Sequence, residues 1–336
     1  MSSVLAGDIG GTKTLLALYR SGGDQLEPLF TRRYSSEDWP DLAPMVLAFL
    51  EEAREVASSD ELPATACFAV AGPVQQGTAR LTNLPWLLEE RQLREATGIA
   101  PLELVNDFAV LVYGLHQLGS GQQASIRQGT PCEGEPVLIL GAGTGLGVAF
   151  GVPGPAGLTA VASEAAHAEF APRNEAEWQL KQWLAADLAI PRVSVERVVS
   201  GTGLGHVARW LLSALHPGEE HPLQQCNGDL PAAVTNAAAL GDPLAREALD
   251  LWLGAYGSVT GDLALTGLCR GGIWLAGGTA GKLLMELRSP IFRRSFLAKG
   301  RLGEVLEPLP ITAVVDPAIG EFSAACRARM LLGQAG

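Results

Sequence analysis

Glycine-rich turns between short apolar runs occur twice in the sequence and constrain its fold most. One turn, Gly141–Gly147, follows four apolar residues, Val137–Leu140, and leads into a second apolar run, Val148–Phe150. The other links Val4–Ala6 to an apolar stretch that ends at Leu18, again through glycines and threonine. Such short apolar runs are typical of buried strands, so each segment predicts a strand, a glycine turn and a strand. Two such hairpins opening two halves of one chain suggest a duplicated unit.

Both turns contain more glycine than a hairpin requires. Glycine lacks a Cβ atom, so the backbone N–H groups of such a turn can approach a phosphate closely. Thr144 adds a hydroxyl donor to the second turn. A purely structural hairpin explains either turn equally well on its own. The repetition of the shape favours a phosphate chain held between two glycine hairpins.

Two better-known nucleotide-binding motifs are absent from the sequence. The segment Gly7–Thr14 has the length of a P-loop, but Thr12 stands where that motif needs its second glycine. Gly141 and Gly143 begin a dinucleotide-binding fingerprint, but Leu146 occupies the position of its third glycine. The hairpins therefore belong neither to a Walker A loop nor to a Rossmann fingerprint.

Composition limits the partners and the compartment that we expect. The 336 residues are 47% hydrophobic, which suffices for a sizeable core and for two lobes. A net charge of -12 and a pI near 4.9 disfavour nucleic acid and anionic membrane surfaces as partners. The five cysteines form no C-x-x-C pair, so we expect neither a zinc site nor a disulfide framework. The sequence shows no signal-peptide pattern and no apolar run of membrane-spanning length, which predicts a cytoplasmic protein.

Two polar residues, Asn106 and Asp107, directly follow the apolar stretch Leu102–Val105. Open α/β sheets place their chemistry at the carboxyl ends of buried strands. The next segment, Phe108–Leu118, has a helical pattern, which would place Asp107 near a helix N-terminus. Both residue types also cap helices well, and from position alone capping is the more common explanation.

Two acidic residues and a histidine follow the second hairpin. Glu164 and His167 stand three residues apart and would converge on one ligand if the backbone turns there, although a lone histidine is more often structural. Glu196 precedes an apolar stretch and a glycine turn. A glutamate in the first turn of a helix, where the helix dipole favours it, explains Glu196 as well.

The remaining pattern predicts further helices and strands. Apolar residues at helical spacing predict helices over 42–57, 89–98, 175–186, 229–268 (with a turn at 241–243) and 318–332. A buried strand is expected over 64–71, and further strands are expected over 28–34 and 311–315. A third glycine turn, Gly277–Gly278, follows the apolar run Ile273–Ala276. Glycines after a strand allow an adenine and a ribose to lie flat against the backbone.

Together these segments resemble the bacterial glucokinases, in the group without a zinc motif, within the hexokinase and actin-like ATPase superfamily. The matching segments follow the order of that family over most of the chain: Gly7–Thr12, Val105–Phe108, Leu140–Gly147, Glu164 with His167, Glu196–Gly201 and Leu275–Gly278. Each segment alone is weakly specific, whereas the set is specific.

The resemblance implies an α/β fold of the two-lobed actin-like ATPase (ribonuclease H-like) type, with duplicated β-sheet units, helices and a ligand cleft between the lobes. The small lobe would comprise residues 1–117 and 317–336, and the large lobe residues 118–316. The implied reaction is ATP-dependent phosphorylation of D-glucose at its 6-hydroxyl, which gives glucose 6-phosphate and ADP. Glucose, ATP and Mg²⁺ are the implied ligands. The family is often dimeric, so a homodimer is the expected assembly.

The resemblance also implies roles for individual residues. The ATP-binding positions would be Gly7, Asp8, Ile9, Gly10, Gly11 and Thr12 in the first phosphate loop, Gly143, Thr144 and Gly145 in the second, and Gly277 and Gly278 at the adenosine turn. Asp8 is expected near Mg²⁺, through water. Asp107 matches the catalytic base. The positions that match sugar binding are Asn106, Asp107, Glu164, His167 and Glu196.

One departure from the family pattern is visible. The family usually has two glycines between Glu164 and His167, where this chain has Ala165 and Ala166. If those positions need positive φ, alanine would be strained there. If they only need to be small, two methyl groups are added near the sugar. Either case bears on sugar affinity and preference.

Three other functions share parts of the pattern. A kinase for another hexose or an amino sugar would carry the same motifs, and a panel of sugars would separate these. An actin-like structural ATPase would share the two hairpins but has no need of a hydroxyl-binding set. A sugar-responsive repressor is disfavoured by the acidic charge of the chain.

Overall fold

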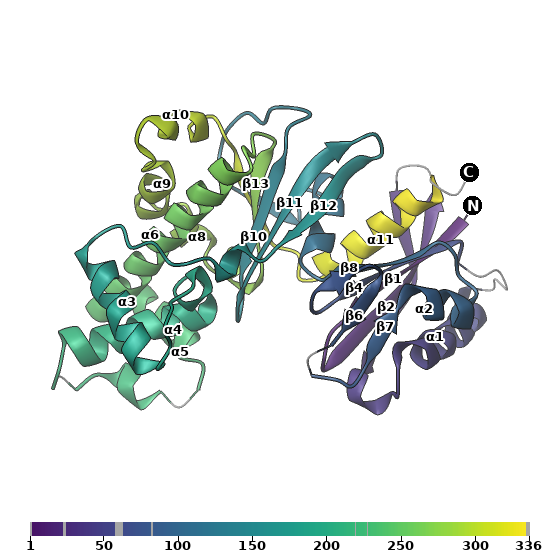
Figure 1. Cartoon of the computed structure of the whole chain (residues 1–336), viewed down its shortest axis with the longest axis horizontal. Coiled ribbons are helices and arrows are strands. Elements are labelled where there is room, and N and C mark those ends of the chain that lie inside the picture. The colour runs from purple at the N-terminus through teal and green to yellow at the C-terminus, as the bar shows by residue number, and fades with distance from the viewer. Residues whose placement is uncertain are drawn as a thin grey trace. The chain divides into compact units, whose positions relative to one another are not determined.

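The computed structural model describes residues 2–22, 25–57, 63–81, 83–218, 220–226 and 228–333, which form two compact units (Figure 1). The first unit comprises Met1–Gly119, Gly151–Ala162 and Asp316–Gly336, and the second comprises Ser120–Phe150 and Ser163–Val315. The lobe boundaries expected from the sequence, 1–117 with 317–336 against 118–316, stay a prediction.

The first unit is built on a five-stranded sheet with the strand order β3-β2-β1-β4-β8. Its strands are β1 (Ser2–Ile9), β2 (Lys13–Gly22), β3 (Gln25–Ser35), β4 (Thr65–Val70) and β8 (Leu102–Asn106). β1 and β2 form the antiparallel hairpin expected around the first glycine turn. β1, β4 and β8 are parallel, so their carboxyl ends meet at one edge of the sheet.

Helices cover the two faces of this sheet. α1 (Leu42–Ala57) packs its Met45 and Phe49 side chains into one core with Leu5 and Phe68 of the sheet. α11 (Ile319–Leu332) contacts β1 and β4. Since successive side chains of a strand point to opposite faces, Asp8 lies on the face away from Leu5, toward α11. A methyl group at Gly320 of α11 would lie only 3.2 Å from the Asp8 carboxylate.

Smaller elements complete the first unit. α2 (Glu90–Thr97) ends at Gly98, whose φ of 73° is the left-handed cap that the sequence predicts for this glycine. A separate three-stranded sheet consists of β5 (Val74–Gln75), β6 (Thr78–Arg80) and β7 (Leu87–Glu89). The short 3-10 helices are η1 (Ser36–Asp38), η2 (Ala109–Tyr113) and η3 (Leu115–Gln117).

The helical segment predicted over 108–118 is confirmed in part, because it is helical but not one continuous α-helix. This segment forms the two 3-10 helices η2 and η3, separated at Gly114. β-branched Val110 and Val112 and the glycine weaken an α-helix here. In addition, a methyl group at Gly114 would collide with the side chain of Ser323 in α11, so close packing against α11 decides the backbone path.

The second sheet has the strand order β12-β11-β10-β13-β14-β9. Its strands are β9 (Gln123–Arg127), β10 (Val137–Ala142), β11 (Leu146–Gly154), β12 (Gly157–Ser163), β13 (Gly272–Ala276) and β14 (Ile311–Val314). β10, β13 and β14 are parallel, and β9 is antiparallel to β14. The order of the first five strands repeats that of the first sheet, which agrees with the duplicated unit predicted from the two hairpins.

Helices form the rest of the second unit. They are α3 (Glu175–Asp187), α4 (Gly201–Trp210), α5 (Leu230–Ala239), α6 (Pro243–Thr266), α7 (Gly278–Lys282), α8 (Leu284–Leu287), α9 (Pro290–Leu297) and α10 (Gly303–Leu306), with a π-helical turn over Leu211–Leu215. The 3-10 helices are η4 (Ala165–His167), η5 (Val195–Arg197), η7 (Pro222–Gln225) and η8 (Gly300–Leu302). Of the described helices, none is long and apolar enough to cross a membrane.

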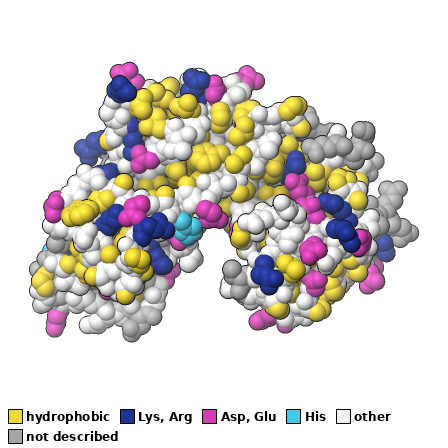
Figure 2. Space-filling model, viewed as in Figure 1, with side chains coloured by type: hydrophobic (Ala, Val, Ile, Leu, Met, Phe, Trp, Pro, Cys, Tyr) yellow, Lys and Arg dark blue, Asp and Glu magenta, His cyan; other side chains and the backbone are white. Residues whose placement is uncertain are grey.

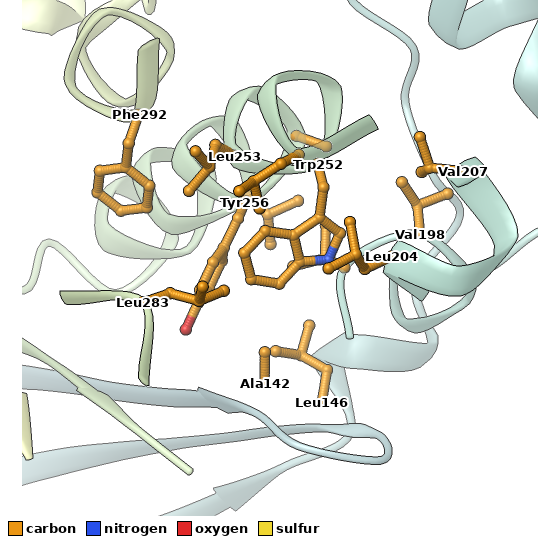
Figure 3. Close-up of a cluster of buried hydrophobic side chains, with 14 of the residues drawn as sticks. Ala142, Leu146, Val198, Leu204, Val207, Trp252, Leu253, Tyr256, Leu283 and Phe292 are labelled. Carbon is orange, nitrogen blue, oxygen red and sulfur yellow. The ribbon is translucent and has the colours of Figure 1, made fainter. Parts of the chain in front are cut away.

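The centre of this core is formed by aromatic residues of α6 (Figure 3). The rings of Trp252 and Tyr256 lie 5.2 Å apart, and Tyr256 meets Phe292 of α9 edge-on. The indole N–H of Trp252 donates a 2.9 Å hydrogen bond to the carbonyl of Ser200, the N-cap of α4. The buried core therefore fixes the position at which α4 begins.

Charged side chains of both signs are distributed over the visible face of each unit (Figure 2). Lys and Arg side chains lie among Asp and Glu side chains there. Among the described residues on this face, no continuous basic stripe of the kind that nucleic acid requires is present.

Candidate active site

Asp107 lies at the carboxyl edge of the first sheet, immediately after β8. Its backbone N–H donates a 2.9 Å hydrogen bond to the carbonyl of Val70 at the end of β4. Asp8 stands near the carboxyl end of β1, the next parallel strand beyond β4. The sheet therefore brings these two predicted site carboxylates to one edge.

Asn106 holds the turn that follows β8. Its side-chain oxygen accepts hydrogen bonds from the N–H groups of Phe108 (3.1 Å) and Ala109 (3.0 Å). Its amide nitrogen donates to the carbonyl of Gly72 (3.0 Å) and to the carboxylate of Asp107 (2.9 Å). Asn106 thus closes the turn before η2, whose N-cap residue is Phe108, and it also contacts Asp107 directly. Its contact with a sugar stays a prediction.

The environment of Asp107 changes its acidity. Burial, and after it the nearby charge of Asp8, raise the pKa of its carboxyl, which is about 6 with all influences together. Hydrogen bonds from Phe108 and Asn106 act in the opposite direction. Burial also raises the pKa of Asp8. Since an ordinary aspartate titrates near a pKa of about 3.9, Asp107 is a stronger base than its residue type alone predicts.

The first glycine turn is held by a residue that the sequence does not point to. The buried Ser36 hydroxyl donates to the carbonyl of Gly10 (2.8 Å) and lies 2.9 Å from the hydroxyl of Thr14. The N–H of Ser36 donates to the carbonyl of Thr12 (3.0 Å). The carbonyls of the turn are thus fixed, while no described residue accepts a hydrogen bond from the N–H groups of Gly11 or Thr12.

The second glycine turn is held by the beginning of α4. The N–H of Gly201 donates to the carbonyl of Gly143 (2.7 Å), and the hydroxyl of Thr202 donates to the carbonyl of Thr144 (2.8 Å). Within the described ranges, the N–H groups of Thr144 and Gly145 have no hydrogen-bond acceptor. Both glycine turns therefore present free backbone donors, which is the arrangement that phosphate binding requires.

Glu196 is attached to the second turn. Its Oε2 atom accepts a 2.9 Å hydrogen bond from the N–H of Leu146. A methyl group at Gly145 would lie 2.5 Å from the same oxygen. Glu196 lies in the first turn of the 3-10 helix η5, in line with the helix-dipole explanation, but its carboxylate also fixes the glycine turn.

Glu164 and His167 come together as the sequence predicts. The 3-10 helix η4 turns the backbone, and Nε2 of His167 lies 3.5 Å from Oε2 of Glu164. Both side chains are exposed, with 76% and 55% of their surface accessible for Glu164 and His167. Neither Ala165 nor Ala166 has positive φ, so the strain considered for these alanines is absent. Ala166 is buried.

The third glycine turn adjoins the second. Gly277 has a φ of 80°, which requires glycine, and a methyl group there would lie 3.1 Å from the carbonyl of Ala142. The hydroxyl of Thr279 donates to the same carbonyl at 2.7 Å. Because Ala142 ends β10 and leads into the second turn, the predicted adenosine turn and second phosphate loop lie side by side.

The structure adds a buried carboxyl that the sequence does not single out. Glu321, in the first turn of α11, is 5% exposed, and its Oε1 atom has no hydrogen-bond partner among the described residues. Burial, together with the charges of Asp8 and Asp316, raises the pKa of Glu321, which is about 7 with all influences together. The hydroxyl of Tyr19 has the opposite effect. Glu321 therefore belongs to the electrostatic surroundings of Asp8.

The acidic residues at the edge of the sheet bear on metal binding. Within the described ranges, no three His, Cys, Asp or Glu side chains gather closely enough to hold a metal ion. Mg²⁺ in phosphate-transfer sites is commonly bound by one or two carboxylates, substrate phosphates and water. The half-buried Asp8 carboxylate at the edge of the sheet fits that kind of site.

Known proteins of one family match nearly the whole chain. A model of the glucokinase family matches residues 5–331. A glucokinase of Synechocystis sp. is 42% identical over 342 residues, which cover 96% of each chain. A glucokinase of Chromohalobacter salexigens is 35% identical over 313 residues, which cover 93% of each chain. The chain belongs to the glucokinase family.

Solved glucokinase structures share the fold. A crystal structure of glucokinase from an Antarctic psychrotroph matches 98% of this chain and 99% of its own, with a TM-score of 0.85 and 27% identity. A ROK family glucokinase from Streptomyces griseus, in complex with glucose and AMPPNP, matches with a TM-score of 0.61 at 22% identity, which supports the fold alone. The predicted actin-like ATPase fold is confirmed. As a member of the glucokinase family, the chain is an enzyme that phosphorylates glucose with ATP.

Proposed function

We propose that the chain transfers the γ-phosphoryl group of ATP to the 6-hydroxyl of D-glucose, with Asp107 as the base that accepts the hydroxyl proton. One observation carries this assignment: Asp107 stands at the carboxyl edge of the sheet, oriented by Asn106, with a pKa raised to about 6. A general base works best when its pKa is close to the working pH. With a pKa of about 6, the Asp107 carboxylate is basic enough to accept a proton and is still largely ionised near neutral pH.

The glycine turns provide the positions for ATP. The free N–H groups of Gly11 and Thr12 would donate to phosphate oxygens, as would those of Thr144 and Gly145. The turn at Gly277 would receive the adenosine. Phosphoryl transfer has a loose transition state, so catalysis depends mainly on positioning and on stabilising the phosphate charge.

Asp8 is the proposed contact to Mg²⁺, through water. When bound, Mg²⁺ would neutralise part of the charge on the phosphate oxygens. The glycine at 320 leaves room for the Asp8 carboxylate, since a methyl group there would lie 3.2 Å from it. The free carboxylate of Asp8 also helps to keep the pKa of Asp107 high.

Hydroxyl groups of the sugar would bind to Asn106, Asp107, Glu164, His167 and Glu196. Carboxylates and amides accept hydrogen bonds from adjacent hydroxyls, and an epimer that lacks one of these bonds leaves a polar group unpaired.

The resemblance to the family also leads us to expect a homodimer in the cytoplasm. Alanine at 165 and 166 favours one further candidate, a preference for another hexose or an amino sugar.

The variant Asp107→Asn tests the assignment of the base. Asparagine keeps the shape of the side chain but cannot accept the proton, so we expect kcat to fall about 10²–10⁴-fold. Glucose binding, measured by calorimetry, should change little. Near-normal kcat would show that Asp107 is not the base. Rates with glucose, mannose, fructose and N-acetylglucosamine then show whether the enzyme prefers glucose or another hexose or amino sugar.

A further inference from the structure

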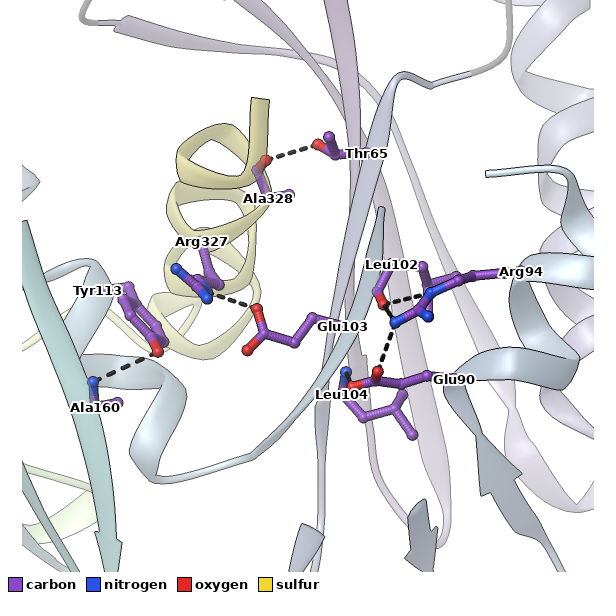
Figure 4. Close-up of polar contacts among 10 residues, drawn as sticks. All are labelled: Thr65, Glu90, Arg94, Leu102, Glu103, Leu104, Tyr113, Ala160, Arg327 and Ala328. Carbon is purple, nitrogen blue, oxygen red and sulfur yellow. Dashed lines mark hydrogen bonds and ion pairs between the residues drawn. The ribbon is translucent and has the colours of Figure 1, made fainter. Parts of the chain in front are cut away.

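Arg327 of α11 makes two strong contacts with a single guanidinium group (Figure 4). Its Nε atom lies 2.6 Å from Oε2 of Glu103 in β8. Its guanidinium carbon lies 4.9 Å from the centre of the Tyr113 ring at the end of η2. The side chain is only 14% exposed, so both contacts are shielded from solvent and salt.

The two residues that Arg327 contacts lie on either side of the proposed base, Asp107, in the sequence. Glu103 lies four residues before Asp107, and Tyr113 lies six residues after it. Arg327 thus holds the strand that leads into Asp107 and the 3-10 helix that leads away from it. Neither contact touches Asp107 itself.

Other contacts also hold β8 and Tyr113, on either side of Asp107 in the sequence. β8 is an edge strand of its sheet, and α2 covers its open edge: Arg94 donates to the carbonyl of Leu102 (2.8 Å), and Glu90 accepts from the N–H of Leu104 (3.0 Å). The hydroxyl of Tyr113 accepts a 3.4 Å hydrogen bond from the N–H of Ala160. Removing Arg327 therefore releases one defined support of the Asp107 segment and leaves the others in place.

The position of α11 is itself fixed beside Arg327. The Thr65 hydroxyl at the start of β4 donates a 2.6 Å hydrogen bond to the carbonyl of Ala328. Ser323, one turn earlier on the helix, packs directly against Gly114. α11 is thus a rigid base from which Arg327 can hold β8 and η2.

Arginine is suited to this place where lysine is not. A planar guanidinium can donate to a carboxylate at its edge while its face lies on an aromatic ring. A lysine ammonium can satisfy one of these contacts but lacks the plane needed to make both at once. Removing the charge leaves the partly buried carboxylate of Glu103 without its cation.

We propose that Arg327 is a positioning residue for phosphoryl transfer, which sets the place of Asp107 by holding Glu103 and Tyr113 together. This inference rests on the proposed role of Asp107 as the base. Small displacements of a reacting group reduce rate strongly, even when they arise away from the reacting atoms. The effect is therefore expected in kcat rather than in the KM for glucose or ATP.

The first test compares Arg327→Met and Arg327→Lys with the wild-type enzyme. We expect kcat to fall about tenfold in Arg327→Met, with both KM values within about twofold of wild type, and little rescue by lysine. Arg20→Met removes an exposed ion pair with Glu27 in the same unit and is the matched control, with kcat unchanged. Unchanged kcat in Arg327→Met, or full rescue by lysine, overturns the proposal.

A second variant guards against misfolding. Tyr113→Leu removes the ring but keeps the ion pair between Arg327 and Glu103, so the fold is less disturbed. It should lower kcat without raising either KM, whereas Tyr113→Phe, which loses only the contact with Ala160, should keep most of the rate. A loss confined to the melting temperature in Tyr113→Leu, with normal kcat, would overturn the proposal.

A double variant separates this proposal from the role of Asp107. If Arg327 acts through the base, Arg327→Met adds no further loss of kcat to Asp107→Asn. An equal fractional loss in both backgrounds would overturn the positioning role while leaving Asp107 as the base. Near-normal kcat in Asp107→Asn alone would instead overturn the assignment of the base, whatever the effect of Arg327→Met.

Discussion

The Oε2 atom of Glu196 accepts a 2.9 Å hydrogen bond from the backbone N–H of Leu146. One carboxylate that is proposed to bind the sugar thus also fixes the end of the second glycine turn. The proposed sugar contact and the proposed phosphate loop are therefore linked directly within one unit. A change in the shape of the turn should affect sugar binding as well as nucleotide binding.

Gly145→Ala tests this link. The added methyl group would lie 2.5 Å from Oε2 of Glu196, which is too close for any real contact, so the carboxylate and the turn must separate. We expect the KM for ATP and the KM for glucose both to rise, each by about tenfold. Steady-state kinetics with each substrate varied in turn measures both values.

Gly121→Ala is the control for that change, because a methyl group there would meet nothing within 4 Å. Its two KM values should equal those of wild type. A rise in the KM for ATP alone in Gly145→Ala would contradict the link through Glu196.

Ser36 gives a second prediction because its hydroxyl supports the first glycine turn. In Ser36→Ala, the carbonyl of Gly10 loses its donor and the buried Thr14 hydroxyl loses a partner. We expect a loss of about 1–3 kcal/mol in the free energy of unfolding and a KM for ATP raised several-fold. Urea unfolding and ATP kinetics measure the two effects.

Thr14→Val separates support of the turn from general stability. It removes the hydroxyl partner of Ser36 but keeps the bond from Ser36 to Gly10, so stability should fall while the KM for ATP stays near that of wild type. Equal KM values for all three proteins would contradict a role for Ser36 in the turn.

The raised pKa of Asp107 predicts the pH dependence of the reaction. The base acts in its deprotonated form, so kcat/KM for glucose should fall as the pH falls through about 6, where this carboxyl of the free enzyme takes up its proton. Rates measured between pH 5 and 8 define this acid limb. A limb centred near pH 4, the ordinary value for aspartate, would contradict the effect of burial and of Asp8.

The same pKa predicts how Asp107→Asn changes stability. The folded-state pKa of about 6 lies above the unfolded value near 3.9, so the proton stabilises the folded state, fully below about pH 4 and not at all well above pH 6. The charged Asp107 therefore destabilises the protein at pH 7.5. We expect Asp107→Asn to have a higher melting temperature than wild type at pH 7.5 and no such advantage at pH 4.

The alanines between Glu164 and His167 give a further prediction. Neither has positive φ, so the double change Ala165→Gly and Ala166→Gly relieves no strain. Glycine instead increases the freedom of the unfolded chain, and we expect the free energy of unfolding to fall by about 1–2 kcal/mol. The KM for glucose should stay within threefold of wild type. A large drop in that KM would show that the two methyl groups obstruct the sugar.

Local patterns predicted much of the fold. The apolar spacing over 42–57 gave α1, Gly98 marked the end of α2, and the repeated hairpins anticipated two sheets with the same strand order. Each of these depends on neighbours in the sequence. The sequence did not show that the helical segment 108–118 is divided into two 3-10 helices, because its backbone path is decided by α11, more than 200 residues further along the chain.

The residues that hold the site in place could not be predicted from the sequence, because they contact residues far away along the chain. Ser36 acts on Gly10 over 26 residues, and Arg327 acts on Glu103 over 224 residues. Neither stands in a pattern that a single sequence reveals. The sequence likewise gives the type of Asp107 but not its pKa, since burial and the charge of Asp8 exist only in the folded chain.

Phosphorylation of glucose by ATP is tested most directly by measuring glucose-dependent turnover of the purified wild-type enzyme with Mg²⁺ and ATP. ADP and glucose 6-phosphate are quantified with and without glucose. Both products are expected to form in equal amounts, and only when glucose is present. ADP release at the same rate with or without glucose, and with no sugar phosphate formed, would contradict it.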